Sequence, residues 1–177
     1  MKRLISLFAG LAASLAIASA VWAGVSARSF SNIDGGQLDL NDWAGRPILV
    51  VNTASQCAYT SQYDQLQTLY DRYRARGLIV LAVPSDDFRQ ELDSAAEVKE
   101  FCEMNFGLDL PMTAITHVRG AAAHPFYVQV RAETGFEPRW NFNKILIGPD
   151  GKVAATWGAP VKPLSSPVTK AIEALLN

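Results

Sequence analysis

Two cysteines are the residues of this chain best suited to redox chemistry. Cys57 follows the apolar run 48–51 and precedes a segment, 63–73, in which apolar residues recur at helical spacing. A thiol between a strand and the start of a helix faces unpaired backbone N–H groups and the positive end of the helix dipole, which stabilise a thiolate. The position favours a reactive cysteine. The alternative is a small buried apolar residue or one half of a permanent disulfide.

Cys102 lies far away along the chain, within a weaker helical pattern over 95–106. Thr60 stands where a C-x-x-C motif would have its second thiol, which argues against a thiol–disulfide oxidoreductase because that chemistry needs a close partner. His117 and His124 have no carboxylate at ligand spacing. We therefore expect neither a metal site nor a bound cofactor.

Trp140 and Asn141 lie just before the predicted strand 144–147 and could donate hydrogen bonds to an anionic sulfur. An indole N–H only donates, whereas an amide both donates and accepts, so the pair could hold a thiolate or a polarised peroxide. Taken singly, the same residues are typical of a core or rim aromatic and of a turn. Asp86 and Asp87 by themselves indicate a turn or the start of a helix.

The elements that must position these residues alternate along the chain. The runs 48–51 and 78–83 are continuously apolar, as buried strands are, and the helical pattern lies between them, which predicts a right-handed parallel unit. Hairpin turns are predicted at 34–36 and 148–151, and a short terminal helix at 168–176. We expect an α/β, thioredoxin-like fold with a mixed central sheet flanked by helices and an N-terminal β-hairpin.

The N-terminal segment has the order of a secretory signal. Two basic residues precede the uncharged stretch 4–27, which is rich in Ala and Leu and contains small residues at candidate cleavage sites. We expect a signal peptide over 1–23, cleaved near Ala20 or Ala23, and a single domain over 24–177. An uncleaved membrane anchor is the alternative, because the stretch is long enough to cross a bilayer.

The composition bounds the class of protein. The formal net charge is −1, with 49% hydrophobic and 19% charged residues. These values exclude a disordered chain and a basic nucleic-acid-binding protein, and two cysteines cannot staple a mini-protein. We expect an exported, periplasmic protein with no nucleic-acid partner and no stable membrane association after cleavage. In such an oxidising compartment, two thiols tend to form a disulfide.

Several motifs in their order along the chain resemble the glutathione peroxidase family. They are the segments 51–60 (VNTASQCAYT), 81–88 (LAVPSDDF), 90–91 (QE), 101–102 (FC) and 140–146 (WNFNKIL). The resemblance runs from about Phe30 to the C-terminus and implies a thioredoxin-fold thiol peroxidase of the cysteine type. The short segment 111–140 lacks the loop by which tetrameric members associate, so we expect a monomer.

The resemblance also implies a role for each site residue. Cys57 would be the peroxidatic cysteine, which reduces hydrogen peroxide and organic or lipid hydroperoxides and becomes a sulfenic acid. Trp140 and Asn141 would hydrogen-bond its sulfur. Cys102 would be the resolving cysteine, which forms a disulfide with Cys57 after its helix locally unravels. A thioredoxin-like protein is the expected reductant, with glutathione as second choice.

Asp87 departs from the family pattern, because it stands where the family usually has an active-site Gln. A carboxylate can only accept hydrogen bonds and opposes a neighbouring thiolate. Either Asp87 is protonated or turned away, or Gln90 fills the space, or the site operates with a less acidic thiol. Our hypothesis is that Asp87 contacts Cys57 and tunes it. The other functions left open are a non-catalytic thioredoxin-fold protein with a structural disulfide and a thiol–disulfide oxidoreductase.

Overall fold

The structure is a computed structural model that describes residues 28–176. The predicted signal peptide over 1–23 lies outside the described residues. No helix between residues 28 and 176 is long and apolar enough to cross a membrane.

A mixed sheet of four strands forms the centre of the domain, in the order β4-β3-β5-β6. Its strands are β3 (Ile48–Thr53), β4 (Ile79–Pro84), β5 (Lys144–Ile147) and β6 (Val153–Trp157). β3 pairs in parallel with β4 and antiparallel with β5, and β5 pairs antiparallel with β6. Every residue of β3 and β4 is buried, as expected from their continuous apolar runs.

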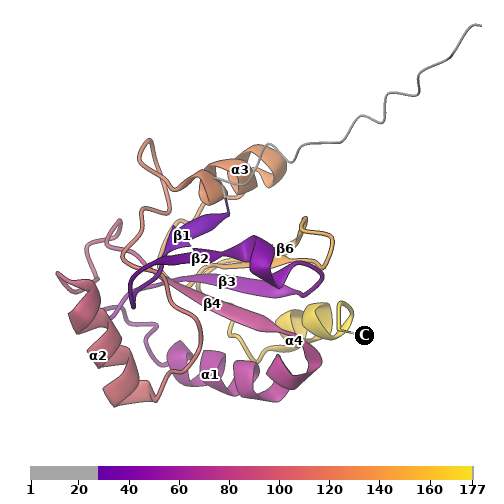
Figure 1. The fold of residues 1–177 in the computed structure, drawn as a ribbon, viewed down its shortest axis with the longest axis horizontal. Coiled ribbons are helices and arrows are strands. Elements are labelled where there is room, and N and C mark those ends of the chain that lie inside the picture. The colour runs from indigo at the N-terminus through magenta and orange to yellow at the C-terminus, as the bar shows by residue number, and fades with distance from the viewer. Residues whose placement is uncertain (1–27, 177) are drawn as a thin grey trace, which may run out of the picture.

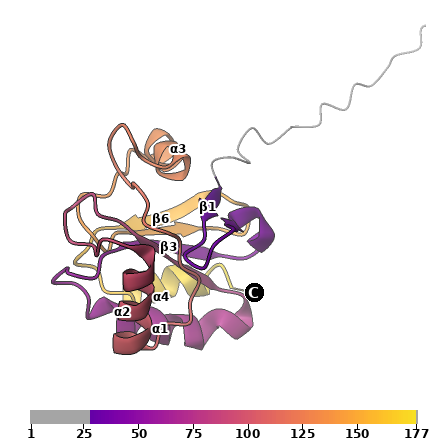
Figure 2. The ribbon, with the colours of Figure 1, turned by 60° about the vertical axis from the view of Figure 1, so that its left-hand side comes forward.

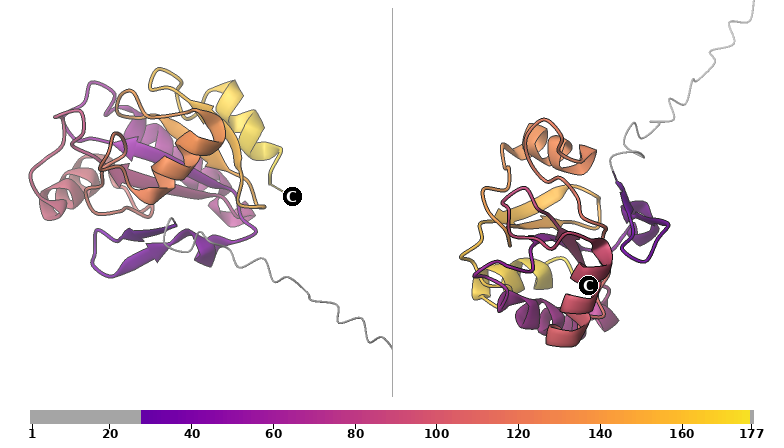
Figure 3. Two further views of the ribbon diagram at one scale, coloured as in Figure 1. Left: turned by 90° about the horizontal axis from the view of Figure 1, so that it is seen from above. Right: turned by 90° about the vertical axis from the view of Figure 1, so that its left-hand side faces the viewer.

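The N-terminal hairpin is a separate two-stranded sheet of β1 (Ser29–Ser31) and β2 (Gln37–Asp39). Gly35 and Gly36, in its turn, both have positive φ, which glycine adopts without steric cost. Figure 3 shows this hairpin set apart from the four-stranded sheet. A 3-10 turn at Leu40–Trp43 then leads toward β3.

Helices cover both faces of the central sheet (Figures 1 and 2). They are α1 (Gln62–Tyr73, followed by the 3-10 turn Arg74–Arg76), α2 (Ala95–Phe106), α3 (Pro125–Thr134) and α4 (Ser166–Glu173). Buried side chains of α1, α2 and α4 share one core with one face of the sheet, and those of α3 share a second core with the opposite face. The thioredoxin-like architecture is confirmed.

The helix α3 was not predicted from the sequence. His124 caps it by accepting from the N–H of Phe126, and Pro125 occupies the first turn, where a missing N–H costs nothing. Its apolar residues are spread around the helix instead of forming one stripe, so the periodicity that identifies α1 is weak here. The terminal helix also begins and ends earlier than expected, at Ser166–Glu173 instead of 168–176.

Candidate active site around Cys57

Cys57 lies beyond the carboxyl end of β3 and before α1, and its side chain is only 3% exposed. The N–H of Thr60 donates to the carbonyl of Cys57 at 3.1 Å, and the N–H of Gln62 donates to that of Tyr59 at 2.8 Å. These turns wind the chain into the first turn of α1. The thiol is therefore held close to the N-terminal end of a helix, as its place in the sequence predicts.

Two residues from the segment after β4, Gln90 and Glu91, hydrogen-bond to the backbone of the Cys57 loop. The N–H of Gln56 donates to the carbonyl of Gln90 at 2.8 Å. Oε1 of Glu91 accepts from the N–H groups of Ser55 and Leu92, each at 2.9 Å. Burial raises the pKa of the Glu91 carboxyl, and the hydrogen bonds that it accepts oppose this change. A buried carboxylate thus fixes the backbone two residues before Cys57.

Asn141 is fully buried, and its Nδ2 donates to Oε1 of Gln90 at 3.3 Å. Arg89 and Phe142, the neighbours of these two residues, have left-handed φ angles of 57° and 61°. Such angles are strained for residues other than glycine and persist only where the surroundings impose them. Two contacts hold Phe142 in this conformation: its buried ring stands 5.1 Å from that of Tyr63, and its N–H donates to the carbonyl of Asn52 at 2.5 Å.

Trp140 is partly exposed, at 41%, and its ring lies 5.5 Å from that of Phe88. Its main-chain carbonyl accepts from Asn52 Nδ2 at 2.9 Å and also from Nδ2 of Asn143. Oδ1 of Asn52 in turn accepts from the N–H of Asn143 at 3.0 Å. Asn52 therefore joins the strand that delivers Cys57 to the turn that carries Trp140 and Asn141. The sequence places Asn52 within a motif but indicates no role for it.

Asp87 directs its carboxylate to a different loop. Oδ1 lies 2.7 Å from His117 Nδ1, and Oδ2 accepts from the N–H groups of Val118 at 2.6 Å and Arg119 at 3.1 Å. Among the described residues, these are the hydrogen bonds of its carboxylate. The structure thus brings Gln90, and not Asp87, to Asn141. Whether Asp87 tunes Cys57 remains a hypothesis for experiment.

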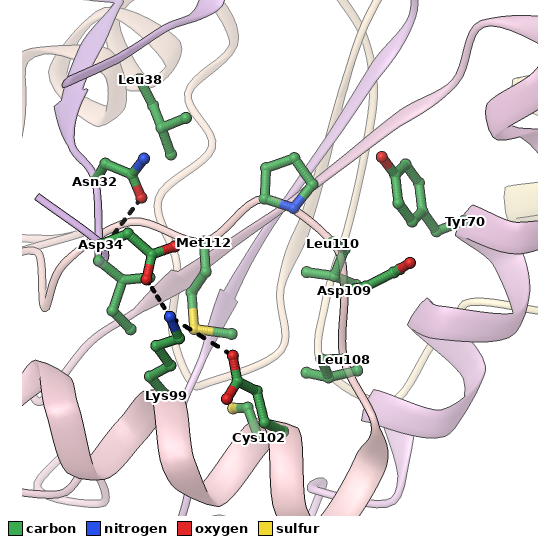
Figure 4. Close-up of a pocket in the computed structure, with 13 residues that line it drawn as sticks. Asn32, Asp34, Leu38, Tyr70, Lys99, Cys102, Leu108, Asp109, Leu110 and Met112 are labelled. Carbon is green, nitrogen blue, oxygen red and sulfur yellow. Dashed lines mark hydrogen bonds and ion pairs between the residues drawn. The ribbon is translucent and has the colours of Figure 1, made fainter. Parts of the chain in front are cut away.

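Cys102 lies on α2 and is fully buried. Both cysteines are free thiols, and both belong to the same core as α1. Burial raises the pKa of Cys102 to about 12, so its thiol is protonated at physiological pH. It lines a cavity of about 320 Å³ between α2 and the segment 108–112, where Lys99 forms ion pairs with Asp34 and Glu103 (Figure 4).

One buried polar atom of the Gln90–Asn141 pair has no hydrogen-bond partner among residues 28–176: Asn141 Oδ1. Native folds leave few such atoms, and each one calls for an explanation. The other buried polar side chains of this region interact with one another, Tyr63 with Thr53 and Cys102, and Glu91 with Ser55. Asn141 Oδ1 is therefore an acceptor that the fold itself does not use.

A mostly apolar pocket of about 470 Å³ opens beside Trp140. Its lining includes Tyr59, two residues after Cys57, together with Phe136, Ala159 and Pro160. No pattern in the sequence predicts this pocket, because its walls come from segments far apart in the chain. As for metals, no group of three or more His, Cys, Asp or Glu within residues 28–176 could hold an ion.

The chain is similar to known proteins in sequence and in structure. The family model of glutathione peroxidase matches residues 25–131. The hydroperoxy fatty acid reductase of Synechocystis is 38% identical over 146 residues, which cover 76% of this chain and 86% of that protein. The glutathione peroxidase-like peroxiredoxin of Schizosaccharomyces pombe is 36% identical over 135 residues, covering 73% and 85%. The crystal structure of T. cruzi GPX1 is 30% identical, with a TM-score of 0.63, and the match covers 84% of this chain and 91% of that one.

Proposed function

Because the chain belongs to the glutathione peroxidase family and is thus a peroxidase that reduces hydroperoxides, we propose that Cys57 is the residue that the peroxide oxidises. The observation that carries this proposal is the placement of a free thiol in the turns that lead into α1, in a loop whose Gln56 N–H donates to the carbonyl of Gln90, the residue that Asn141 contacts. The thiolate sulfur attacks one peroxide oxygen, an S–O bond forms as the O–O bond breaks, and the other oxygen leaves as water or an alcohol after protonation. Cys57 becomes a sulfenic acid, oxidised by two electrons.

Asn141 and Trp140 supply donors for the charged sulfur in this proposal. The amide of Asn141 now donates to Gln90 and leaves its own oxygen without a partner. If both amides turn over, Asn141 Oδ1 accepts from Gln90 Nε2, and Asn141 Nδ2 is free to donate to the sulfur. The indole N–H of Trp140 is the second donor.

Cys102 completes the cycle as the resolving residue. A buried, protonated thiol cannot attack a sulfenic acid from its present place, so α2 has to open first. Val98 and Cys102 are the buried residues of this helix, and Phe101 and Phe106 pack partly buried against the same core, so these are the apolar contacts that local opening breaks. The Cys102 thiolate then attacks the sulfenic sulfur, the disulfide forms and hydroxide leaves as water.

A dithiol protein of the thioredoxin type is the proposed reductant, because an intramolecular disulfide is the form of the enzyme that such a protein reduces by exchange. Glutathione is the second choice. We further propose that the protein acts as a monomer outside the cytoplasm, after removal of residues 1–23. The basis for export is the basic and apolar order of the N-terminal sequence.

Hydroperoxides with an apolar tail are the proposed substrates beside hydrogen peroxide. The pocket beside Trp140 is mostly apolar and begins two residues from Cys57, so a bound tail would bring its peroxide group near the sulfur. The name of the Synechocystis relative, a hydroperoxy fatty acid reductase, is consistent with such a substrate.

Peroxide consumption by the reduced protein tests the assignment of the two cysteines. We expect Cys57→Ser to abolish consumption, and Cys102→Ser to consume one equivalent and then fail to turn over with thioredoxin. Equal rates in the wild type and Cys57→Ser would contradict the assignment and favour a structural disulfide. Reduction of a protein disulfide without peroxide consumption would favour a thiol–disulfide oxidoreductase. Comparing thioredoxin with glutathione in the same assay identifies the reductant.

A further inference from the structure

A buried lysine without an acidic partner lies next to the proposed site. Lys144 is the first residue of β5, and its side chain is fully buried. Its ammonium donates to Gln62 Oε1 at 2.5 Å and to the carbonyl of Ala159 at 3.3 Å. Both acceptors are neutral, and none of the ion pairs among residues 28–176 includes Lys144. A buried ammonium without a counter-charge lowers stability, so its presence calls for a function.

The contacts of Lys144 join three segments that surround Cys57 and the Trp140 pocket. Gln62 is the first residue of α1, and its Nε2 donates to the same Ala159 carbonyl at 2.8 Å. Ala159 lines the pocket beside Trp140. Lys144 itself directly follows the turn that carries Trp140 and Asn141. One ammonium and one amide thus connect the start of α1, the loop after β6 and the Trp140 turn.

The charge on this lysine changes within the neutral pH range. Burial lowers the pKa of Lys144 to about 7, and no other cause contributes clearly. The groups around it carry no compensating charge: Gln62 faces it from α1, Ala159 faces it from the loop after β6, and Val51 and Trp157 are its sheet partners in β3 and β6. Lys144 is therefore positively charged below neutrality and loses its charge above it.

We propose that Lys144 is a positioning residue for the reaction at Cys57, which holds the start of α1 against the Trp140 turn and adds an unpaired positive charge there. The inference rests on Cys57 being the reacting thiol. The charge favours the thiolate while Lys144 is protonated. Because Lys144 loses its charge above neutrality, the reaction at Cys57 should lose this support as the pH rises.

Lys144→Met separates this role from a structural one. Methionine has a similar length and no charge, so we expect the thermal midpoint of the full chain to stay equal or to rise. We expect the rate of Cys57 alkylation by iodoacetamide, measured in a Cys102→Ser background, to fall by at least about threefold below neutrality. The loss should become smaller above neutrality, where Lys144 of the wild type is uncharged as well. The rate of reaction with hydrogen peroxide should fall in parallel. Lys152→Met, at an exposed lysine in the β5–β6 turn, is the control that should change none of these.

Gln62→Glu removes the unpaired charge but keeps the contact. A carboxylate against the ammonium holds Lys144 in its charged form and cancels its charge, so the alkylation rate at neutral pH should fall as in Lys144→Met while the start of α1 stays bound to β5. A Lys144→Met protein that keeps the wild-type rate and pH profile would overturn the inference. A loss of rate in Lys144→Met that comes together with a lower thermal midpoint would also overturn it, because it would indicate a structural role. Alkylation measures the reactivity of Cys57 in the absence of peroxide. If Cys57 is alkylated but the protein consumes no peroxide, the assignment of Cys57 as the peroxidatic residue fails, and this result is distinct from a failure of the inference on Lys144.

Discussion

Asp87 and His117 form a contact between the segment after β4 and the loop that precedes α3, with Oδ1 and Nδ1 separated by 2.7 Å. The other carboxylate oxygen accepts from the two following backbone N–H groups of that loop. The same loop places the guanidinium of Arg119 5.3 Å from the ring of Phe88, which in turn contacts Trp140. Asp87 therefore supports Trp140 indirectly, through the loop and Phe88.

Replacing Asp87 should consequently disturb the loop more than the thiol. Asp87→Ala leaves the N–H groups of Val118 and Arg119 without their acceptor, and we expect the free energy of unfolding to fall by about 1–3 kcal/mol. Asp87→Asn retains an acceptor oxygen and should cost less. In both variants and in Asp87→Gln, the pH profile of Cys57 alkylation should match the wild type. A shifted profile in Asp87→Gln and Asp87→Ala would instead support direct tuning of Cys57 by Asp87.

Glu91 should make the stability of the protein depend on pH. Burial holds its pKa above that of the unfolded chain, so folding disfavours the ionised form. The stabilisation from this group is therefore complete below the ordinary carboxyl pKa and is lost as the pH rises through the raised value. Glu91→Gln keeps an acceptor for Ser55 and Leu92 and should remove this part of the pH dependence, measured by denaturant unfolding between about pH 4 and pH 8.

The matched variants make that prediction specific. Glu91→Ala removes the acceptor of two buried N–H groups, so it should lower the free energy of unfolding by about 1–3 kcal/mol at every pH. Glu100→Gln, on the exposed face of α2, should leave the wild-type pH dependence in place. If Glu91→Gln unfolds with the same pH dependence as the wild type, Glu91 is not the group responsible.

Opening of α2 should control the reactivity of Cys102. Val98 is the other fully buried residue of this helix, and Val98→Ala weakens its packing by about 1–3 kcal/mol. We expect faster labelling of Cys102 and faster disulfide formation after peroxide treatment, with an unchanged rate of the first reaction at Cys57. Met104→Ala is the control, because Met104 lies on the same helix but is 79% exposed. Equal labelling rates in all three proteins would mean that Cys102 reacts without opening of the helix.

The sequence predicted those features that depend on local pattern. The apolar runs of β3 and β4 and the helical spacing of α1 are strong signals, and together with the motifs around Cys57 and Trp140 they identified the fold and the family, both of which are confirmed. The sequence could not decide between Asp87 and Gln90, because the left-handed Arg89 between them redirects the chain. It also gave no role to Asn52 or Lys144, whose partners are distant in sequence and meet them only in the folded domain.

The Trp140 pocket should determine the preference for substrates with an apolar tail. Phe136 lines it, and Phe136→Asp places a charge where the tail would bind. A bound tail would remove water from this carboxylate, which weakens the binding of a substrate with a tail but not that of hydrogen peroxide. We expect kcat/KM for a fatty acid hydroperoxide to fall by about tenfold or more, while kcat/KM for hydrogen peroxide stays unchanged. Val128→Asp, at an exposed apolar residue of α3 outside the pocket lining, should affect neither substrate. Equal losses for both substrates in Phe136→Asp would show general damage to the site, and no loss for either would exclude the pocket from substrate binding.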